Sequence, residues 1–178
     1  MSRAGTRIGL AAFLVIAGSE ATHNAVANGD TRTISFHHLH TGEDLTITYK
    51  RNGRYDADAL KKINWVLRDW RQNQDVAMDP HLIDLVWEVH RDLGSKGAIQ
   101  VVCGYRSPET NFQLYMQSNG VAESSFHTRG MAVDIMTHSR SSGQMTRAAR
   151  VMRMGGVGNY RGSRYIHVDT GPFRTWTY

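Results

Sequence analysis

Hydrophobic and polar residues follow two different spacings along the chain, and together these spacings predict an α+β fold. Short runs of β-branched and aromatic residues are typical of strands, and they occur at residues 31–37, 45–50, 98–103, 131–136 and 165–169. Apolar residues three or four positions apart predict helices, which we expect at residues 57–70, 80–93, 108–118 and 143–153. We therefore expect a small mixed or antiparallel sheet with helices packed on one side.

Turn and capping residues set the expected ends of these elements. Residues 41–44 (TGED) are suited to a hairpin between the first two strands, and Asp56 and Asp79 can each begin a helix. The glycine-rich run 155–158 is predicted to be a turn before the last strand. It is not a phosphate-binding loop, because it lacks the Lys-Ser/Thr tail and a following helix.

The first 27 residues have the pattern of a secretory signal peptide. Two arginines precede the apolar run 8–18, and residues 25–27 (AVA) form a small-x-small cleavage site. The apolar run is about half as long as the ~20 residues that span a bilayer. We therefore expect cleavage after Ala27, an exported or periplasmic protein made of residues 28–178 as a single domain, and no stable membrane span. The alternative is an uncleaved membrane tether.

Composition restricts the class of protein and the kind of metal site. The 178 residues are 40% hydrophobic and 21% charged, with a net charge of +5, which fits one globular domain; we expect a monomer. The single cysteine, Cys103, excludes an intramolecular disulfide and any site built from several thiolates. We interpret it as a small buried residue. No basic stripe interleaved with aromatic residues is present, so nucleic acid is not an expected partner.

The segment 125–134 (SFHTRGMAVD) carries the first candidate metal ligands. Between His127 and Asp134, Gly130 permits a turn or bulge that joins the loop holding the histidine to the strand holding the carboxylate. Histidine nitrogen and carboxylate oxygen are the usual ligands of a hydrolytic zinc ion, and such sites need three protein ligands. The residues alone leave open a surface histidine and a strand-end aspartate that bind no metal.

The last expected strand, 165–169 (YIHVD), supplies a third candidate ligand. Side chains alternate along a strand, so Tyr165, His167 and Asp169 share one face while the two aliphatic residues share the other. If the aliphatic face packs into the core, the three polar side chains line a wet cleft together. A histidine that is merely hydrogen-bonded is the alternative at this point.

These motifs, taken in order, resemble those of a known enzyme superfamily. The pattern Ser-x-His-x-x-Gly-x-Ala-x-Asp at 125–134, followed by His167-x-Asp169, resembles the zinc D-Ala-D-Ala metallopeptidases, a superfamily that includes the hedgehog-type domains. Further segments resemble its murein endopeptidase K branch: HTGE (40–43), DP (79–80), GYRSPETN (104–111), GGVG (155–158) and HVDTG (167–171). The resemblance covers residues 36–176. Cys103 stands where the family usually has serine, which we expect to change packing rather than abolish activity.

The resemblance implies a zinc cleft on the sheet, with zinc held by His127, Asp134 and His167 and a water in the fourth position. Zinc lowers the pKa of bound water toward ~7 and polarises the scissile carbonyl. Arg106 matches the family's arginine beside the metal, which can neutralise an oxyanion or hold a substrate carboxylate. Ser125 matches a hydroxyl on the substrate side. The alternative for Arg106 is a salt bridge near a helix cap, and the alternative for Ser125 is a simple turn residue.

The motifs do not identify the general base. Many relatives have an acidic residue three positions before the last histidine ligand, where this chain has Arg164. Asp169 is the nearest acidic candidate on the same strand face. It either deprotonates water or only orients His167, and we prefer the orienting role. Tyr165 can donate a hydrogen bond to the tetrahedral intermediate.

Two functions fit these expectations. The first is an exported zinc metallopeptidase that hydrolyses peptide bonds in peptidoglycan, acting as an endopeptidase on cross-links, with carboxypeptidase specificity left open. The second is a non-catalytic peptidoglycan-binding or zinc-stabilised module on the same fold. Peptidoglycan peptides are the expected partner in both. We interpret His37, His38 and His40 as exposed histidines at a strand end, and His90 as a core or half-buried histidine of the second helix.

Overall fold

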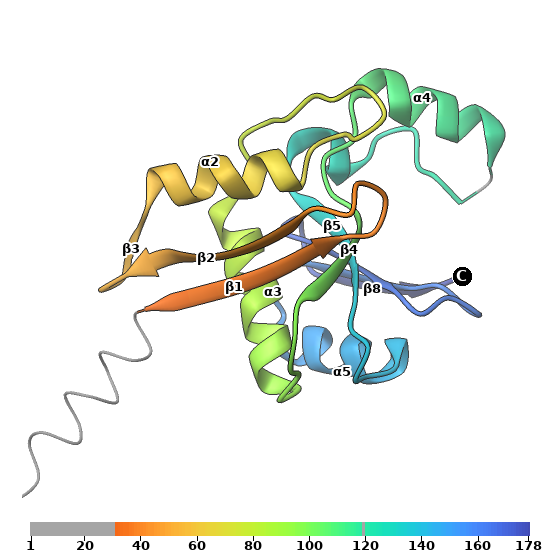
Figure 1. Ribbon diagram of the computed structural model, residues 1–178. Coiled ribbons are helices and arrows are strands. Elements are labelled where there is room, and N and C mark those ends of the chain that lie inside the picture. Colours follow the sequence, from red (N-terminus) through yellow and green to blue (C-terminus); the bar gives the residue numbers. More distant parts are fainter. Residues whose placement is uncertain (1–30, 119) are drawn as a thin grey trace, which may run out of the picture.

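The computed structural model describes residues 31–118 and 120–178 (Figure 1). The signal peptide expected at residues 1–27 lies outside the described residues. Within them, no helix combines the length and the apolar character needed to cross a membrane.

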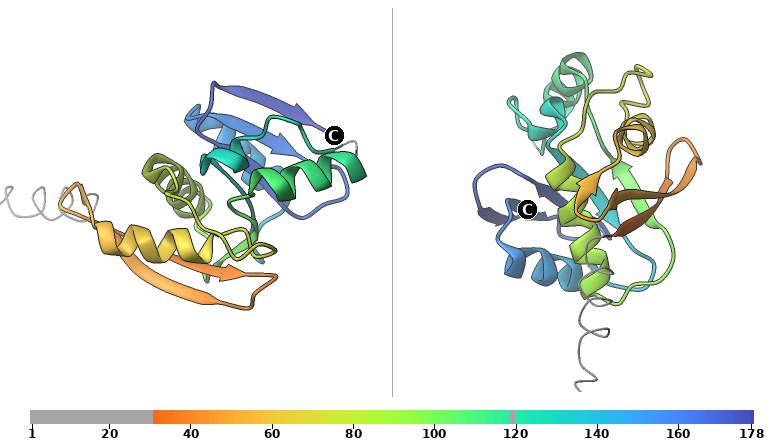
Figure 2. Two further views of the ribbon diagram at one scale, coloured as in Figure 1. Left: turned by 90° about the horizontal axis from the view of Figure 1, so that it is seen from above. Right: turned by 90° about the vertical axis from the view of Figure 1, so that its left-hand side faces the viewer.

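Eight strands form one mixed sheet in this part of the chain. Their spatial order is β3 (Arg54–Tyr55), β2 (Asp44–Arg51), β1 (Arg32–His38), β4 (Ile99–Cys103), β5 (Ala132–Met136), β7 (Ile166–Asp169), β6 (Gly156–Asn159) and β8 (Arg174–Thr177). β1 pairs with β4 and β6 pairs with β8 in parallel, and the other neighbours are antiparallel. The N-terminal and C-terminal strands therefore lie at opposite ends of the sheet (Figure 2). The mixed sheet is confirmed, and it is larger than the small sheet expected.

Four α-helices and one 3-10 helix lie among the described residues: α2 (Ala57–Val66), α3 (Pro80–Asp92), α4 (Pro108–Gln117), η1 (Phe126–Arg129) and α5 (Ser142–Met152). Asp56 begins α2 by accepting hydrogen bonds from the backbone N–H groups of the first turn, and Asp79 begins α3 in the same way. These carboxylates satisfy N–H groups that have no partner within the helix. Both predicted helix starts are confirmed.

The ends of some elements differ from the sequence-based expectation. α2 stops at Val66 instead of reaching Trp70, because the backbone of Asp69 exchanges hydrogen bonds with that of Gln74 and turns the chain. The glycine-rich run predicted to be a turn forms instead the beginning of β6. β3, which has two residues, and β8, which has four, have no counterpart among the predicted strands.

One hydrophobic core covers one face of the sheet. α2 packs against β2, and α3 and α5 pack against β7 (Figure 1). The buried side chains of this core include Phe36, Ile63, Leu82, Val101, Ile135, Met145 and Val168. The buried residues of α4 are polar, Thr110 and Asn111, so the helical layer that forms the core comprises α2, α3 and α5. The opposite face of the central strands carries the candidate site.

Candidate metal centre and active site

Strand register places the candidate residues in one row across the sheet. Cys103 on β4 is opposite Asp134 on β5, which is opposite His167 on β7. The row continues through Gly158 on β6 to Trp176 on β8. Residues opposite one another in a sheet point to the same face. The side chains of this row therefore emerge together, while the aliphatic residues between them point into the core.

His127 reaches the row from η1 rather than from a strand. The Ser125 hydroxyl caps this short helix by accepting from the backbone N–H of His127 at 3.3 Å. The chain then turns at Gly130, whose φ is +67°. A Cβ atom there would lie 2.7 Å from the carbonyl oxygen of Ala77, so both the backbone angle and the close approach require glycine. The turn predicted at this glycine is confirmed.

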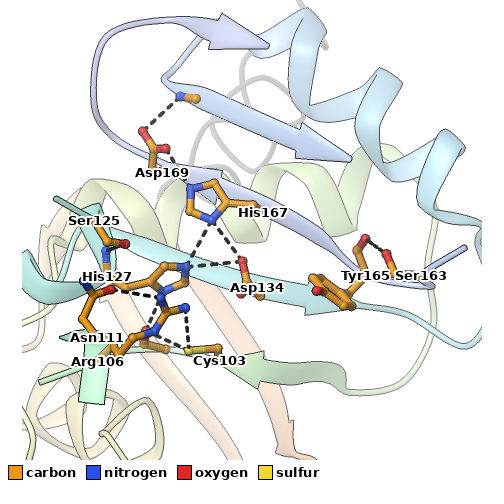
Figure 3. A network of polar contacts seen from close by, with 12 residues as sticks. Cys103, Arg106, Asn111, Ser125, His127, Asp134, Ser163, Tyr165, His167 and Asp169 are labelled. Atoms are coloured by element: carbon orange, nitrogen blue, oxygen red, sulfur yellow. Dashed lines mark hydrogen bonds and ion pairs between the residues drawn. The ribbon is translucent and has the colours of Figure 1, made fainter. Parts of the chain in front are cut away.

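Three side-chain atoms converge at the centre of the site (Figure 3). His127 Nε2 lies 3.1 Å from His167 Nδ1 and 3.3 Å from Asp134 Oδ1, and His167 Nδ1 lies 3.0 Å from Asp134 Oδ1. The three residues are 2%, 7% and 6% exposed for His127, Asp134 and His167. These buried atoms form a nearly equilateral triangle.

Hydrogen bonds at the far side of each histidine fix which nitrogen faces this triangle as an acceptor. His127 Nδ1 donates to the carbonyl oxygen of Gly104 at 2.7 Å, and His167 Nε2 donates to Asp169 Oδ2 at 2.8 Å. Because neither oxygen can donate, the neutral rings keep their lone pairs on the atoms that face Asp134. Three acceptors at hydrogen-bond distance need a shared proton or a cation between them.

The donor set fits a divalent zinc ion. A tetrahedral zinc with ligand bonds of ~2.0–2.1 Å separates its ligand atoms by about 3.3 Å, close to the distances in this triangle. Two neutral imidazoles and one carboxylate are also the ligand types that zinc takes in hydrolytic sites. The Cys103 sulfur lies nearby: its atom and the ligand atoms of His127 and Asp134 lie within 4.8 Å of one another.

Charge interactions within the triangle are strong. Burial would lower the pKa of His127, but the Asp134 carboxylate and Cys103 outweigh burial and raise this pKa above its usual range. Burial would raise the pKa of Asp134, yet His127 and His167 hold it well below its usual range. Protonated His127 and ionised Asp134 thus form a buried ion pair. The same carboxylate attracts a cation in place of that proton.

Asp169 lies behind His167 rather than in the open part of the site. It is fully buried and accepts from His167 Nε2, from the backbone N–H groups of Gly156 and Gly171, and from both Nη atoms of Arg174. Burial would raise its pKa, but the hydrogen bonds from His167 and Arg174 hold the pKa well below its usual range. This carboxylate is therefore surrounded by donors and cut off from solvent.

A cavity of about 400 Å³ opens onto the triangle. Six of the seven residues singled out in the sequence line it: Arg106, Ser125, His127, Asp134, Tyr165 and His167. Asp169 does not, so the wet face expected on β7 includes only part of the predicted set. Tyr160, Trp176 and Tyr178 give the cavity an aromatic wall, and Arg174 also lines it. His37, His38, His40 and His90 do not line this cavity. The expectation of exposed histidines is wrong for His38, which is fully buried.

Arg106 uses only two of its five N–H donors in contacts with neighbouring side chains. Its Nη1 donates to Asn111 Oδ1 at 3.1 Å, and its Nη2 lies 3.7 Å from the sulfur of Cys103. Its Nε is buried and has no hydrogen-bond partner among the described residues. Asn111 in turn donates to the carbonyl oxygens of residues 122 and 123. The guanidinium is thus fixed at the cavity with spare capacity for an anionic or carbonyl oxygen.

Contributors to the site that sequence reasoning missed include Asn111, Arg174 and Trp176. Asn111 lies in the segment that resembles the murein endopeptidases, but its contact with Arg106 depends on the turn from β4 into α4. Arg174 and Trp176 belong to β8, and their approach to β7 depends on the parallel pairing of β8 with β6. No local pattern signals that pairing.

Comparison with known proteins identifies the family of the chain. The family model described as peptidoglycan L,D-endopeptidase MepK matches residues 26–176. The chain is 38% identical over 145 residues to peptidoglycan L,D-endopeptidase MepK of Escherichia coli strain K12, covering 82% of this chain and 80% of that protein. It is 39% identical over 152 residues to the probable peptidoglycan L,D-endopeptidase MepK of Haemophilus influenzae, covering 85% and 82%. The chain therefore belongs to the peptidoglycan L,D-endopeptidase MepK family.

Proposed function

We propose that this protein is an exported zinc endopeptidase that hydrolyses peptide bonds in peptidoglycan cross-links. The observation that carries the proposal is the buried triangle of three lone-pair atoms facing a 400 Å³ cavity. The relatives' printed activity, L,D-endopeptidase, supplies the bond type.

His127, Asp134 and His167 would hold the zinc ion, with Cys103 adjacent to the ligand set. When bound, zinc supplies a Lewis acid and lowers the pKa of bound water toward ~7. The contacts of the chain support this use of the three residues, because both histidines are locked in the tautomer that a metal requires. Asp134 and His167 are positioned by neighbouring strands of the sheet, and His127 is positioned by the capped 3-10 helix η1.

Arg106 and Tyr165 would act on the substrate side. Arg106 lines the cavity, and its Nη1 and Nη2 atoms each keep a second N–H beyond the contacts with Asn111 and Cys103. These N–H groups can donate to the oxygen that becomes negative as the carbonyl is attacked, or to a substrate carboxylate. Tyr165 lines the same cavity, and burial together with the Asp134 charge raises its pKa. A phenol that keeps its proton can donate a hydrogen bond to the tetrahedral intermediate.

Asp169 and Ser125 would position ligands. Asp169 is already saturated by donors, and no water reaches it, so the contacts favour orientation of His167 over proton abstraction from water. Ser125 fixes the start of η1 and lines the cavity, which allows it both the capping role and contact with substrate. Asp169, the carboxylate of β7, would therefore not act as the general base that deprotonates water.

Export follows from a peptidoglycan substrate, which lies outside the cytoplasmic membrane. Residues 1–27 would serve as the signal peptide, with cleavage after Ala27 and a monomeric product of residues 28–178. Mass spectrometry of the protein secreted by the producing cell tests this part: a mass that begins at Asn28 is expected. A mass that retains residue 1 would instead indicate a tether.

The activity is tested by digesting purified peptidoglycan and separating the fragments by chromatography. The zinc-loaded protein should convert cross-linked dimers to monomers. Chelation should stop the reaction, and added zinc should restore it. Asp134→Ala should bind less zinc and release no monomers. Stoichiometric zinc without any fragment change would favour the alternative, a zinc-stabilised module that binds peptidoglycan without cutting it.

A further inference from the structure

We infer that Arg174 is a positioning residue of the metal centre, which fixes Asp169 and, through it, the ring of His167. The inference rests on the zinc centre proposed above. It concerns a residue of β8 that no sequence motif singled out, and it is carried by a continuous set of contacts from the guanidinium to the ligand nitrogen.

Arg174 and Asp169 form a bidentate ion pair. Arg174 Nη1 donates to Asp169 Oδ1 at 2.9 Å, and Nη2 donates to Oδ2 at 2.7 Å. Two parallel bonds between planar groups fix the rotation of the carboxylate as well as its position. A lysine cannot reproduce this geometry, because its ammonium is a single point of charge.

The Asp169 carboxylate in turn fixes the orientation of the His167 ring. Asp169 Oδ2 accepts from His167 Nε2 at 2.8 Å, and the opposite nitrogen of the same ring, Nδ1, lies in the ligand triangle. Rotating the carboxylate would therefore turn the imidazole and move Nδ1. Partners of this kind commonly change metal affinity by about 10–100-fold when they are removed.

Arg174 also contacts the surroundings of both histidine ligands through aromatic rings. Its guanidinium carbon lies 4.9 Å from the ring centre of Phe126, which directly precedes His127. It lies 4.9 Å from the ring centre of Trp176, whose ring is 5.2 Å from that of His167. The guanidinium is thus in contact with residues beside each histidine. An ion pair that only attached β8 to the sheet would not need these contacts beside both histidines.

The rest of β8 is attached independently of this side chain. Residues 174–177 pair with residues 156–159 of β6 along the whole strand, and the Arg174 side chain is 40% exposed. Loss of the guanidinium should therefore leave the strand in place. A purely structural role would lower the stability of the metal-free and metal-loaded protein equally and leave metal affinity unchanged.

The test measures zinc affinity by competition with a chromophoric chelator, and it records the visible absorption spectrum of the cobalt-substituted protein. Arg174→Met should bind zinc about 10–100-fold more weakly than wild type and show an altered cobalt spectrum. Asp169→Asn should have a comparable effect, and the double variant should lose little more than the worse single variant. Affinity within twofold of wild type for Arg174→Met, with an unchanged cobalt spectrum, would overturn the inference.

Arg91→Met is the matched control. Arg91 also forms an ion pair, with Glu88, and also stacks on an aromatic ring, that of Trp87 at 4.9 Å, but it has no connection to the ligands. Its zinc affinity should equal that of wild type, and an equal loss in this variant would overturn the inference.

Folding is checked by far-ultraviolet circular dichroism. If Arg174→Met is unfolded, Arg174→Lys is measured in its place and should bind zinc several-fold more weakly; full affinity would overturn the inference. Because only the metal is used as a probe, zinc binding by wild type without peptidase activity would contradict the proposed function and leave this inference standing. Failure of wild type to bind zinc would overturn both.

Discussion

Gly158 gives a quantitative test of how the row of residues across the sheet is packed. Its strand neighbour Trp176 lays its ring directly over it: an added Cβ would lie 2.5 Å from Cε2, 2.6 Å from Cζ2 and 2.7 Å from Nε1. Carbon atoms in contact are normally ~3.5–4.0 Å apart. In Gly158→Ala the indole must therefore move by about 1 Å, and the ring next to it is that of His167.

Two effects of opposite sign determine the expected magnitude. Overpacking of this kind costs about 1–3 kcal/mol, whereas alanine in a strand gains about 0.5–1 kcal/mol over glycine from reduced chain entropy. The free energy of unfolding of the metal-free protein should thus fall by roughly 1 kcal/mol, and by at most about 2.5 kcal/mol. Since the displaced ring lies beside that of His167, a proposed metal ligand, zinc affinity should fall as well.

Urea unfolding followed by circular dichroism measures the first quantity, and chelator competition measures the second. Gly120→Ala is the control, since that glycine lines the same cavity but a Cβ there would have no atom within 4 Å. Adding Trp176→Ala to Gly158→Ala should remove the clash, so the two changes should be strongly non-additive. A Gly158→Ala protein as stable as wild type, with the same zinc affinity, would refute this account of the packing.

Three further substitutions test individual contacts. Asp169→Asn should lower the rate of peptidoglycan hydrolysis about 10–100-fold without moving the acidic limb of its pH profile, whereas disappearance of that limb would make Asp169 the base. Cys103→Ser should retain zinc and most of the activity, because the sulfur is adjacent to the ligand set rather than needed to complete it; an intense sulfur-to-cobalt absorption band in cobalt-loaded wild type would contradict this. Burial, aided by His40, lowers the pKa of His38 from 6.5 to about 4, and its Nδ1 accepts from the N–H groups of His40 and Thr41. The folded state therefore favours neutral His38, and urea unfolding should show stability that is full above pH 6.5 and declines toward pH 4 in wild type, but less in His38→Asn.

Much of the fold is visible in the sequence because the helices and the central strands bury one side. The spacing of apolar residues that predicts α3 is the same spacing that fills the core with Leu82 and Val86. β6 was missed for a physical reason: its residues Gly156 and Gly158 have no side chains that alternate in polarity. Their glycine identity is set by Arg174 and Trp176 on a neighbouring strand, which a local pattern does not contain.

For the candidate site, the sequence indicates the residues but not how they come together. His127, Asp134 and His167 could be proposed because their motifs are short and each is read within one segment. Their convergence depends on the register that pairs Asp134 with His167, which no periodicity specifies. The position of Asp169 differs from the sequence-based expectation because strand alternation predicts a face, but not whether solvent reaches it.

The separation of the two histidines along the chain has a consequence for a protein with a single cysteine. His127 and His167 are 40 residues apart, so a metal ion held by both would close a loop of that length in the manner of a cross-link. A covalent cross-link that closes such a loop restricts the unfolded chain by an amount equivalent to about 4 kcal/mol. Zinc would thereby take on the role that disulfides have in many exported proteins. The chain would gain that stabilisation only after β5, β7 and η1 had come together.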